Sequence, residues 1–160
     1  MQLLDRLHRN PKGPLKIAFV GNGRKAFDLW SRAAFAWCNC VAVAEEIADV
    51  TTPAKAPDGW GTLLRRGRKR GIKVICVTQR PAEADKTAIS QAAVIHTGYL
   101  GRDADIAYVA REMKVEPAAL DSLVPLDWVR YRRADLSIVG GNLTHKRVTV
   151  LREGVKRTPT

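Results

Sequence analysis

Short apolar segments alternate with helix-like segments along most of this chain, and this alternation constrains the fold more than any other feature. The segments 16–20, 40–45 and 72–78 are predicted strands, and 40–45 (CVAVAE) is apolar on both faces. Two apolar faces are typical of a central strand in a parallel sheet that helices cover on both sides. The order of strands and helices therefore predicts an α/β fold with a mainly parallel sheet.

The remaining segments fit this alternation. A turn is predicted at 21–24, a Pro/Gly-rich loop at 51–61 and a fourth strand at 93–100. We expect an amphipathic helix over 103–113 with Asp103 as its cap, and a short helix over 117–123 with a proline in its first turn. Further helices are expected over 2–9, 26–37 and 62–71, with a short one within 79–91.

The pattern changes at residue 126, after which polar and apolar residues alternate. A Gly-Gly-Asn turn separates the alternating runs, which predicts two or three antiparallel strands at the sheet edge. The length of 160 residues is typical of a single domain. We expect residues 1–14 to form an N-terminal helix and linker, 15–125 the α/β core, 126–152 a β-hairpin appendage and 153–160 a flexible tail.

The charge of the chain indicates a polyanionic partner. Lys and Arg number 27 against 16 Asp and Glu, a net charge of +11, which favours nucleic acid or nucleotide phosphates. The sequence has no apolar run of about 18 residues that could span a membrane, and no signal peptide is predicted. Cys38, Cys40 and Cys76 lack metal-ligand spacing, as do the histidines, which argues against a zinc site and favours a reducing cytoplasm.

The segment GNGRKA (21–26) is the first that can carry chemistry. It lies between a predicted strand and a predicted helix and matches the GxGxxA pattern of dinucleotide-binding folds, with Gly21 and Gly23 at the turn. In that interpretation Glu45 or Glu46, near the end of the next strand, binds the ribose. The alternative is an ordinary turn, because bulky residues follow the second glycine where helix and strand would pack closely.

Two adjacent carboxylates end the next apolar strand, VAVAEE (41–46). At the carboxyl end of a buried strand, Glu45 can bind Mg²⁺ directly or through water. Glu46 faces the other way and can polarise a water molecule for attack on a γ-phosphate. This arrangement corresponds to the Walker B motif of NTPases, and the alternative is a pair of solvated acids.

A dense basic stretch precedes the third strand, with six basic residues between positions 65 and 73. Their side chains can contact DNA phosphates or reach the nucleotide of a neighbouring subunit. Gln79, at the tip of the strand that follows, can orient water or sense a phosphate. The alternative for the stretch is a solvated basic helix face. Its members are Arg65, Arg66, Arg68, Lys69, Arg70 and Lys73.

In this order, EEIADVTTP (45–53), LLRRGRKRGIKVI (63–75) and CVTQRPAEADKT (76–87) resemble the FtsK–HerA superfamily of P-loop ATPases. The resemblance is to small phage and prophage ATPases of the genome-packaging or zonula-occludens-toxin-like kind. It covers about residues 15–123 and is most specific from 44 to 86. It implies a partial RecA-like P-loop NTPase core in an oligomeric, often hexameric, motor that couples ATP hydrolysis to the movement of DNA.

The resemblance also implies roles for single residues. Glu45 resembles the Walker B acid that holds Mg²⁺, and Glu46 resembles the catalytic glutamate. Gln79 resembles the strand-end glutamine that senses the γ-phosphate, and Arg80 is a candidate phosphate contact. Arg68 or Arg70 resembles the arginine finger that acts across a subunit interface, which leaves Arg65, Arg66, Lys69 and Lys73 as candidate contacts to DNA.

The chain departs from this family in its Walker A motif. No stretch matches GxxxxGK[ST], so the sequence resembles the C-terminal two-thirds of the ATPase domain. The departure has three explanations: a truncated gene, a Walker A loop on a separate chain, or a degenerate relative kept for DNA or subunit binding. We expect ATP and Mg²⁺ to bind only if a Walker A motif is supplied elsewhere. The expected partners are DNA and either further copies of this chain in a homo-oligomer or a Walker A-bearing partner chain, and we expect an exposed strand flank to pair with another chain.

Three functions follow from these patterns. The first is a fragment or subunit of an ATP-driven DNA translocase or phage DNA-packaging ATPase. The second is a non-catalytic, basic DNA-binding or assembly protein on a degenerate ATPase scaffold, which predicts salt-sensitive DNA binding without nucleotide dependence. The third is a dinucleotide-binding, Rossmann-like domain, which predicts protection by NAD(P).

Overall fold

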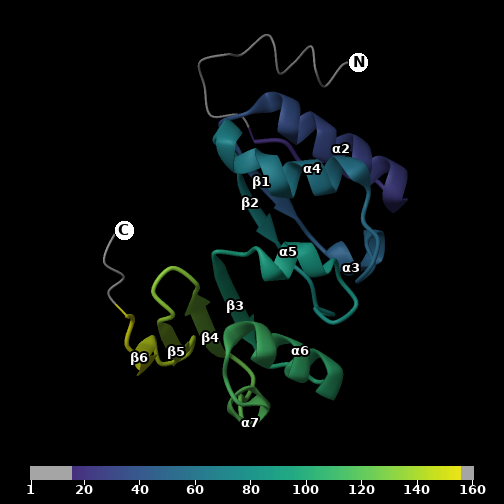
Figure 1. The fold of residues 1–160 in the computed structure, drawn as a ribbon. Coiled ribbons are helices and arrows are strands. Elements are labelled where there is room, and N and C mark those ends of the chain that lie inside the picture. The colour runs from purple at the N-terminus through teal and green to yellow at the C-terminus, as the bar shows by residue number, and fades with distance from the viewer. Residues whose placement is uncertain (1–15, 156–160) are drawn as a thin grey trace.

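The computed structural model describes residues 16–155, so the helix expected over 2–9 and the end of the predicted tail lie outside it. Figure 1 shows two layered regions joined by α5. The strands are β1 (Val41–Ala44), β2 (Lys73–Cys76), β3 (Val94–Gly98), β4 (Asp127–Arg132), β5 (Ile138–Asn142) and β6 (Arg147–Arg152). The helices are α2 (Gly23–Trp37), α3 (Ile47–Val50), α4 (Asp58–Arg66), the 3-10 helix η1 (Gly67–Arg70), α5 (Lys86–Ser90), α6 (Asp103–Met113) and α7 (Pro117–Asp121).

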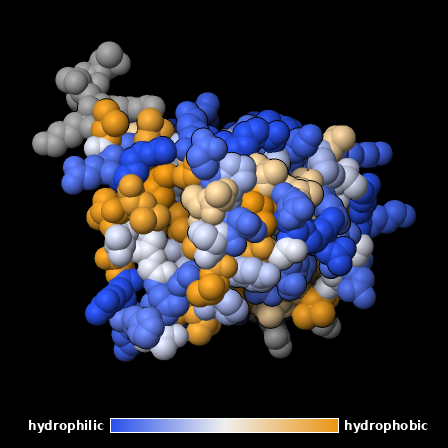
Figure 2. All heavy atoms as spheres, turned by 90° about the horizontal axis from the view of Figure 1, so that it is seen from below, coloured by the Kyte–Doolittle hydropathy of each residue, from blue (hydrophilic) through white to orange (hydrophobic). Residues whose placement is uncertain are grey.

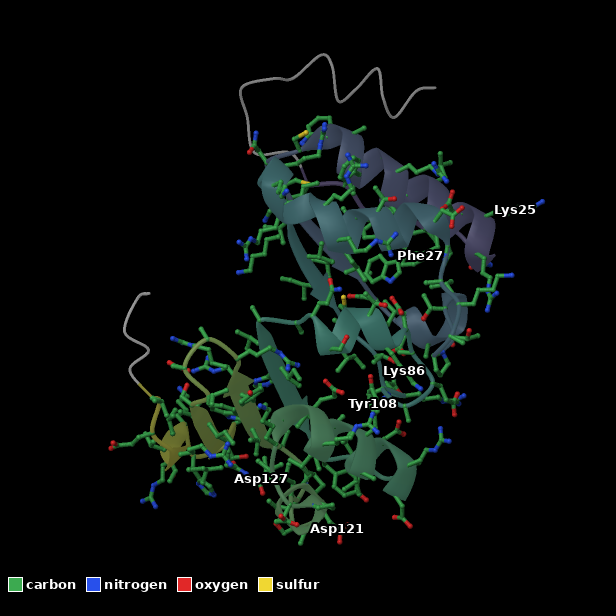
Figure 3. The ribbon with its side chains drawn as sticks, viewed as in Figure 1. Lys25, Phe27, Lys86, Tyr108, Asp121 and Asp127 are labelled. Atoms are coloured by element: carbon green, nitrogen blue, oxygen red, sulfur yellow. The ribbon has the colours of Figure 1, made fainter. Side chains whose placement is uncertain are left out.

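The first region, which we call the parallel half, is built on β1 and β2. These strands pair in parallel from Val41 with Lys73 to Ala44 with Cys76. Helices α2 and α4 pack against each other beside this sheet. Their contact contains aromatic rings, because Phe27 of α2 lies 5.0 Å from the ring of Trp60 of α4, measured between centroids (Figure 3). Trp60 is completely buried, and so are the aliphatic side chains of Ile47 and Leu63.

The second region, which we call the antiparallel half, is a four-stranded sheet in the order β3-β4-β5-β6. Its inner face carries buried side chains that pack against α6 and α7, including Ile95, Val129 and Tyr131. Alternate residues of β3 and β4 therefore point into this core, as the period of a strand requires. Figure 2 views the molecule from below and shows hydrophobic residues gathered on the left, the side where β5 and β6 lie in Figure 1.

Helix α5 and the segment after it join the two halves. Ile89 of α5 packs against the buried clusters of both. Arg133, just beyond β4, donates hydrogen bonds from Nε to the Ala92 carbonyl at 3.0 Å and from Nη2 to the Ile89 carbonyl at 3.4 Å. The same guanidinium lies 3.4 Å from a Glu112 carboxylate oxygen of α6. The two halves are therefore joined around α5 by apolar packing and by the hydrogen bonds of Arg133.

The predicted α/β class is confirmed, and several elements match their predicted positions. Helix α6 has the predicted bounds, and β1 and β2 lie within predicted strands. Pro117 is in the first turn of α7, as predicted. Asp103 does not cap α6, because it is the first helical residue and the N-cap position is Arg102. No helix within residues 16–155 has both the length and the apolar character to cross a membrane.

The strand arrangement differs from the prediction in three respects. Residues 16–20 form no strand, and Val20 is 95% exposed; among the described residues 16–155, β1 pairs with β2 alone. The strand predicted over 93–100 pairs antiparallel with β4 rather than joining the parallel sheet. Strand β1 is covered on one face only, since Val41 is 59% exposed. The local pattern of apolar residues predicts where a strand can form. Which strands pair depends on residues that are distant in the sequence.

Candidate functional site

The carboxyl ends of β1 and β2 bring Glu46 and Gln79 together. Because the two strands are parallel neighbours, the residues that follow them meet at one edge of the sheet. The Gln79 side-chain amide donates a hydrogen bond from Nε2 to Glu46 Oε1 at 2.9 Å, and the Gln79 backbone N–H donates to Glu46 Oε2 at 3.4 Å. Two residues predicted separately to act on a γ-phosphate are thus direct neighbours.

The backbone at Glu46 is unusual for this residue type. Its φ of 47° and ψ of 51° place it in the left-handed region, which costs a residue with a side chain about 1–2 kcal/mol. The sharp turn lets the next residue, Ile47, bury its side chain completely and donate its backbone N–H to the Val77 carbonyl at 3.2 Å. The turn therefore fixes the Glu46 carboxylate over the end of β2. Strained residues of this kind cluster at functional sites.

Glu45 lies beside this pair and is exposed. Magnesium keeps several waters and binds through one or two protein carboxylates together with substrate phosphates. A single accessible carboxylate at a strand end fits that donor set. Within the described part of the chain, no three His, Cys, Asp or Glu side chains cluster to hold a metal by themselves. Glu45 is accordingly the residue that would hold Mg²⁺ at this site.

The basic stretch of residues 65–73 lies at the other end of β2. It occupies the end of α4, all of η1 and the first residue of β2, whereas Gln79 follows the last residue of that strand. The structure therefore separates these basic side chains from the Glu46–Gln79 pair of the same chain. All six are exposed: Arg65, Arg66, Arg68, Lys69, Arg70 and Lys73.

The two finger candidates have different environments. The Arg70 guanidinium lies 4.7 Å from the centroid of the Phe35 ring, and its Nε donates to the Phe35 carbonyl at 3.0 Å. Arg66 also lies over that ring, at 5.9 Å. Arg68 forms no side-chain hydrogen bond or salt bridge with any residue in 16–155. Arg68 is therefore the more available of the two for a neighbouring molecule.

Arg80 is close to the Glu46–Gln79 pair in sequence and points toward an acid. Its Nη1 lies 3.6 Å from a Glu83 carboxylate oxygen, and that carboxylate also accepts a 2.6 Å hydrogen bond from Arg102. The hydrogen bond from Arg102 is the main cause that lowers the pKa of Glu83. Arg80 is exposed and is held by one weak ion pair, so its guanidinium can turn toward a phosphate.

Sequence reasoning missed a basic cavity between α2 and the loop before α4. Its volume is about 370 Å³, and its lining includes Arg24, Lys25 and Lys55. Figure 3 shows Lys25 pointing away from the body of the protein at the start of α2. Asp28 closes one wall, where hydrogen bonds from Arg32 and from the Gly59 backbone lower the pKa of its carboxyl group. The sequence signal for this cavity is the Arg-Lys pair after Gly23, at the end of the turn predicted over 21–24.

The geometry does not support the dinucleotide-binding interpretation. That motif needs a strand directly before its glycines, and residues 16–20 form none. Helix α2 begins at Gly23, which has a φ of 80° and has open space where a Cβ would lie. Gly23 therefore serves the turn into the helix, and Gly21 instead packs closely against the Phe19 ring.

Comparison with known proteins identifies the fold. No family model matches the chain. The curated protein P9 of Pseudoalteromonas phage PM2 is 47% identical over 51 residues, which cover 32% of this chain and 23% of that protein. The genome-packaging NTPase B204 of Sulfolobus turreted icosahedral virus 2, solved with ATP-gammaS, matches with a TM-score of 0.54 and 15% identity, over 76% of this chain and 57% of that one.

Two further structures give the same result. The complex of that NTPase with AMPPCP matches 82% of this chain and 59% of its own, at a TM-score of 0.54 and 13% identity. B204, the DNA-packaging ATPase of Sulfolobus turreted icosahedral virus, matches 83% of this chain and 59% of its own length, at a TM-score of 0.53 and 16% identity. The predicted resemblance to genome-packaging ATPases is thus confirmed at the level of the fold. The chain spans less than 60% of each of these structures.

Proposed function

We propose that this chain is part of an ATP-driven DNA-packaging motor of a virus or phage, active in the cytoplasm of the infected cell. The observation that carries the proposal is the 2.9 Å hydrogen bond between Gln79 and Glu46 at the ends of two parallel strands. The fold supports it, because the matching solved structures include a genome-packaging NTPase in complex with ATP-gammaS and with AMPPCP. Open α/β sheets bind ligands at this edge.

In this proposal the two residues divide the chemistry of ATP hydrolysis. Glu46 accepts a proton from the attacking water, or orients that water through its carboxylate oxygens. Gln79 holds the Glu46 carboxylate through Nε2 and can exchange this hydrogen bond for one to a γ-phosphate oxygen. Glu45 holds Mg²⁺, directly or through water. Bound Mg²⁺ would supply positive charge that offsets the negative charge developing on the phosphates.

The phosphates need further donors, which we propose lie outside these 160 residues. The 160 residues contain no GxxxxGK[ST], whose backbone amides and lysine would cradle the phosphates. In our proposal a Walker A loop outside this sequence, such as one on a partner chain, supplies this cradle. The separation of Arg68 from the Glu46–Gln79 pair of its own chain is consistent with an arginine that acts on the nucleotide of a neighbouring subunit.

The test is Mg-ATP binding and hydrolysis by the chain, alone and mixed with the products of the flanking reading frames. Glu46→Gln should lower the turnover rate about 10²-fold or more while Mg-ATP binding persists, because general-base catalysis is worth about that factor. Glu116→Gln is the matched control, because Glu116 is an exposed glutamate just before α7, in the antiparallel half. The enzymatic proposal fails if no mixture binds Mg-ATP, or if Glu46→Gln hydrolyses it at the wild-type rate.

A non-catalytic DNA-binding role is the second candidate, and the six exposed basic residues of the stretch 65–73 favour it. Four of them, Arg65, Arg66, Lys69 and Lys73, are proposed to contact DNA phosphates. Each phosphate contact adds about 0.9 to the slope of log K against log salt. Replacing Arg65, Lys69 and Lys73 together by alanine should therefore lower the slope by about 2–3. If DNA binding in this assay responds to Mg-ATP, the motor is favoured over the non-catalytic role.

A further inference from the structure

The four-stranded sheet of the antiparallel half has one face that no helix within residues 16–155 covers. The strand register places alternate residues of β3 to β6 on this side, opposite the buried residues that pack on α6. We call it the open sheet face. Its side chains are Val94, His96, Trp128, Arg130, Arg132, Val139, Val148 and Val150.

Two aromatic rings stack on the open sheet face. The His96 and Trp128 centroids lie 5.3 Å apart, with 27° between the ring planes. The indole also lies close to β5, since a Cβ on Gly141 would come within 3.0 Å of it. The glycine therefore makes room for the indole. His96 is exposed, so the stack leaves aromatic surface in contact with solvent.

The charges beside the stack are positive. Arg130 is exposed, its guanidinium lies 5.8 Å from the centroid of the Trp128 ring, and it forms no salt bridge with residues 16–155. Arg132 is exposed too, and its nearest acid, Asp135, is 4.0 Å away and lies beyond the end of β4. None of the alternating positions of the open face carries an acid. Burial, and then the charge of Arg130, lower the pKa of His96, which favours the neutral ring.

We propose that the open sheet face binds single-stranded nucleic acid, with bases stacked on the His96–Trp128 pair and phosphates on Arg130 and Arg132. Aromatic side chains on an open sheet, flanked by arginines, suit unpaired bases, whose ring faces are free. In a duplex the ring faces are stacked on neighbouring base pairs, so a duplex could contact only the arginines of this face. This inference goes beyond the proposed function, because it requires neither ATP nor the Glu46–Gln79 pair.

The experiment measures the fluorescence anisotropy of a labelled single-stranded oligothymidylate and of a duplex of equal length. Trp128→Ala should weaken binding of the single strand by about 5- to 150-fold, which corresponds to the stacking energy of one base. Binding of the duplex should stay unchanged, because the net charge of the protein is the same and the basic stretch 65–73 is intact. Trp128→Phe, which keeps an aromatic ring, should restore most of the single-strand affinity.

The controls separate this site from the rest of the molecule. Trp37→Ala removes an exposed tryptophan from α2 and should leave single-strand binding unchanged. Arg130→Ala alters no buried side chain and should weaken binding of the single-stranded oligothymidylate. This variant therefore tests the proposal even if Trp128→Ala unfolds. Glu46→Gln should bind single strands normally, so failure of the ATPase proposal would not affect this result.

Two outcomes would overturn the proposal. In the first, Trp128→Ala and Arg130→Ala are folded and bind oligothymidylate as tightly as the wild type. In the second, both variants abolish self-association in sedimentation velocity without changing single-strand affinity. Val139 and Val150 would then belong to an interface between copies of the chain, and the open face would be a protein contact.

Discussion

The two halves of this molecule use their sheets in different ways. The parallel half presents the ends of two short strands, where Glu46 and Gln79 meet, and its sheet has two strands within residues 16–155. The antiparallel half presents the face of a wider sheet, where His96 and Trp128 stack. Parallel strands gather polar residues at one edge because their carboxyl ends coincide, whereas an antiparallel sheet with one bare face displays alternate side chains as a surface. Sheet type thus decides where each half can hold a ligand.

Among substitutions that should affect the two halves differently, Trp60→Ala should have the largest effect on stability. Trp60 is completely buried in the parallel half, and its Nε1 donates to buried Asp85 at 3.0 Å. Loss of this side chain should lower the free energy of unfolding by about 3–5 kcal/mol. Hydrogen exchange should show lost protection in β1 and β2 while β4 and β5 remain protected, because the buried clusters of the two halves are distinct. Equal loss in both halves would show that they unfold as one unit.

A smaller effect should distinguish the strained turns of the two halves. Glu46 and Lys146 both have left-handed backbones, with φ of 47° and 50°. Glu46→Gly should be more stable than Glu46→Ala by about 1–2 kcal/mol, since both lose the carboxylate and only glycine relieves the backbone. Both variants should lose the proposed ATP hydrolysis. Lys146→Gly should raise the free energy of unfolding by about 1 kcal/mol and leave the proposed ATP hydrolysis unchanged. Chemical denaturation measures each difference, and equal stabilities of the two Glu46 variants would refute strain at the site.

The smallest perturbation is a chemical probe of the parallel sheet. Burial, with a contribution from Asp85, raises the pKa of the Cys76 thiol to about 12. The thiolate is the reactive form, so with Cys38 and Cys40 replaced by serine the remaining thiol should react slowly with a disulfide reagent at pH 8. The rate should rise about tenfold per pH unit up to at least pH 10. A plateau near pH 9 would mean that β2 is more open than this structure shows.

The sequence was sufficient for elements whose signals are local. Helix α6 has its predicted bounds because its amphipathic period is continuous, and β1 and β2 are marked by apolar runs. Residues 16–20 are equally apolar but form no strand, since a strand needs a partner that the pattern cannot name. The antiparallel pairing of β3 depends for the same reason on β4, about thirty residues away in the sequence.

The candidate sites also include features that local sequence predicts and features that depend on strand pairing. The carboxylates and Gln79 could be predicted to meet, because the ends of neighbouring parallel strands coincide. The distance between Gln79 and the basic stretch could also have been derived, since β2 lies between them. The alternation of Trp128, Arg130 and Arg132 predicts a strand of a hairpin, but it does not by itself indicate the open sheet face. Recognising that His96 completes it required the register between β3 and β4.

The position of Ile89 has a consequence for how the chain folds during synthesis. The buried cluster of the parallel half draws its described residues from 27–89, and that of the antiparallel half from 82–138. The two cores are therefore consecutive along the chain and overlap only around α5. N-terminal units generally fold first on the ribosome. The parallel half can close its core while β4 is still unmade, and α5 then offers a finished surface on which the second core assembles.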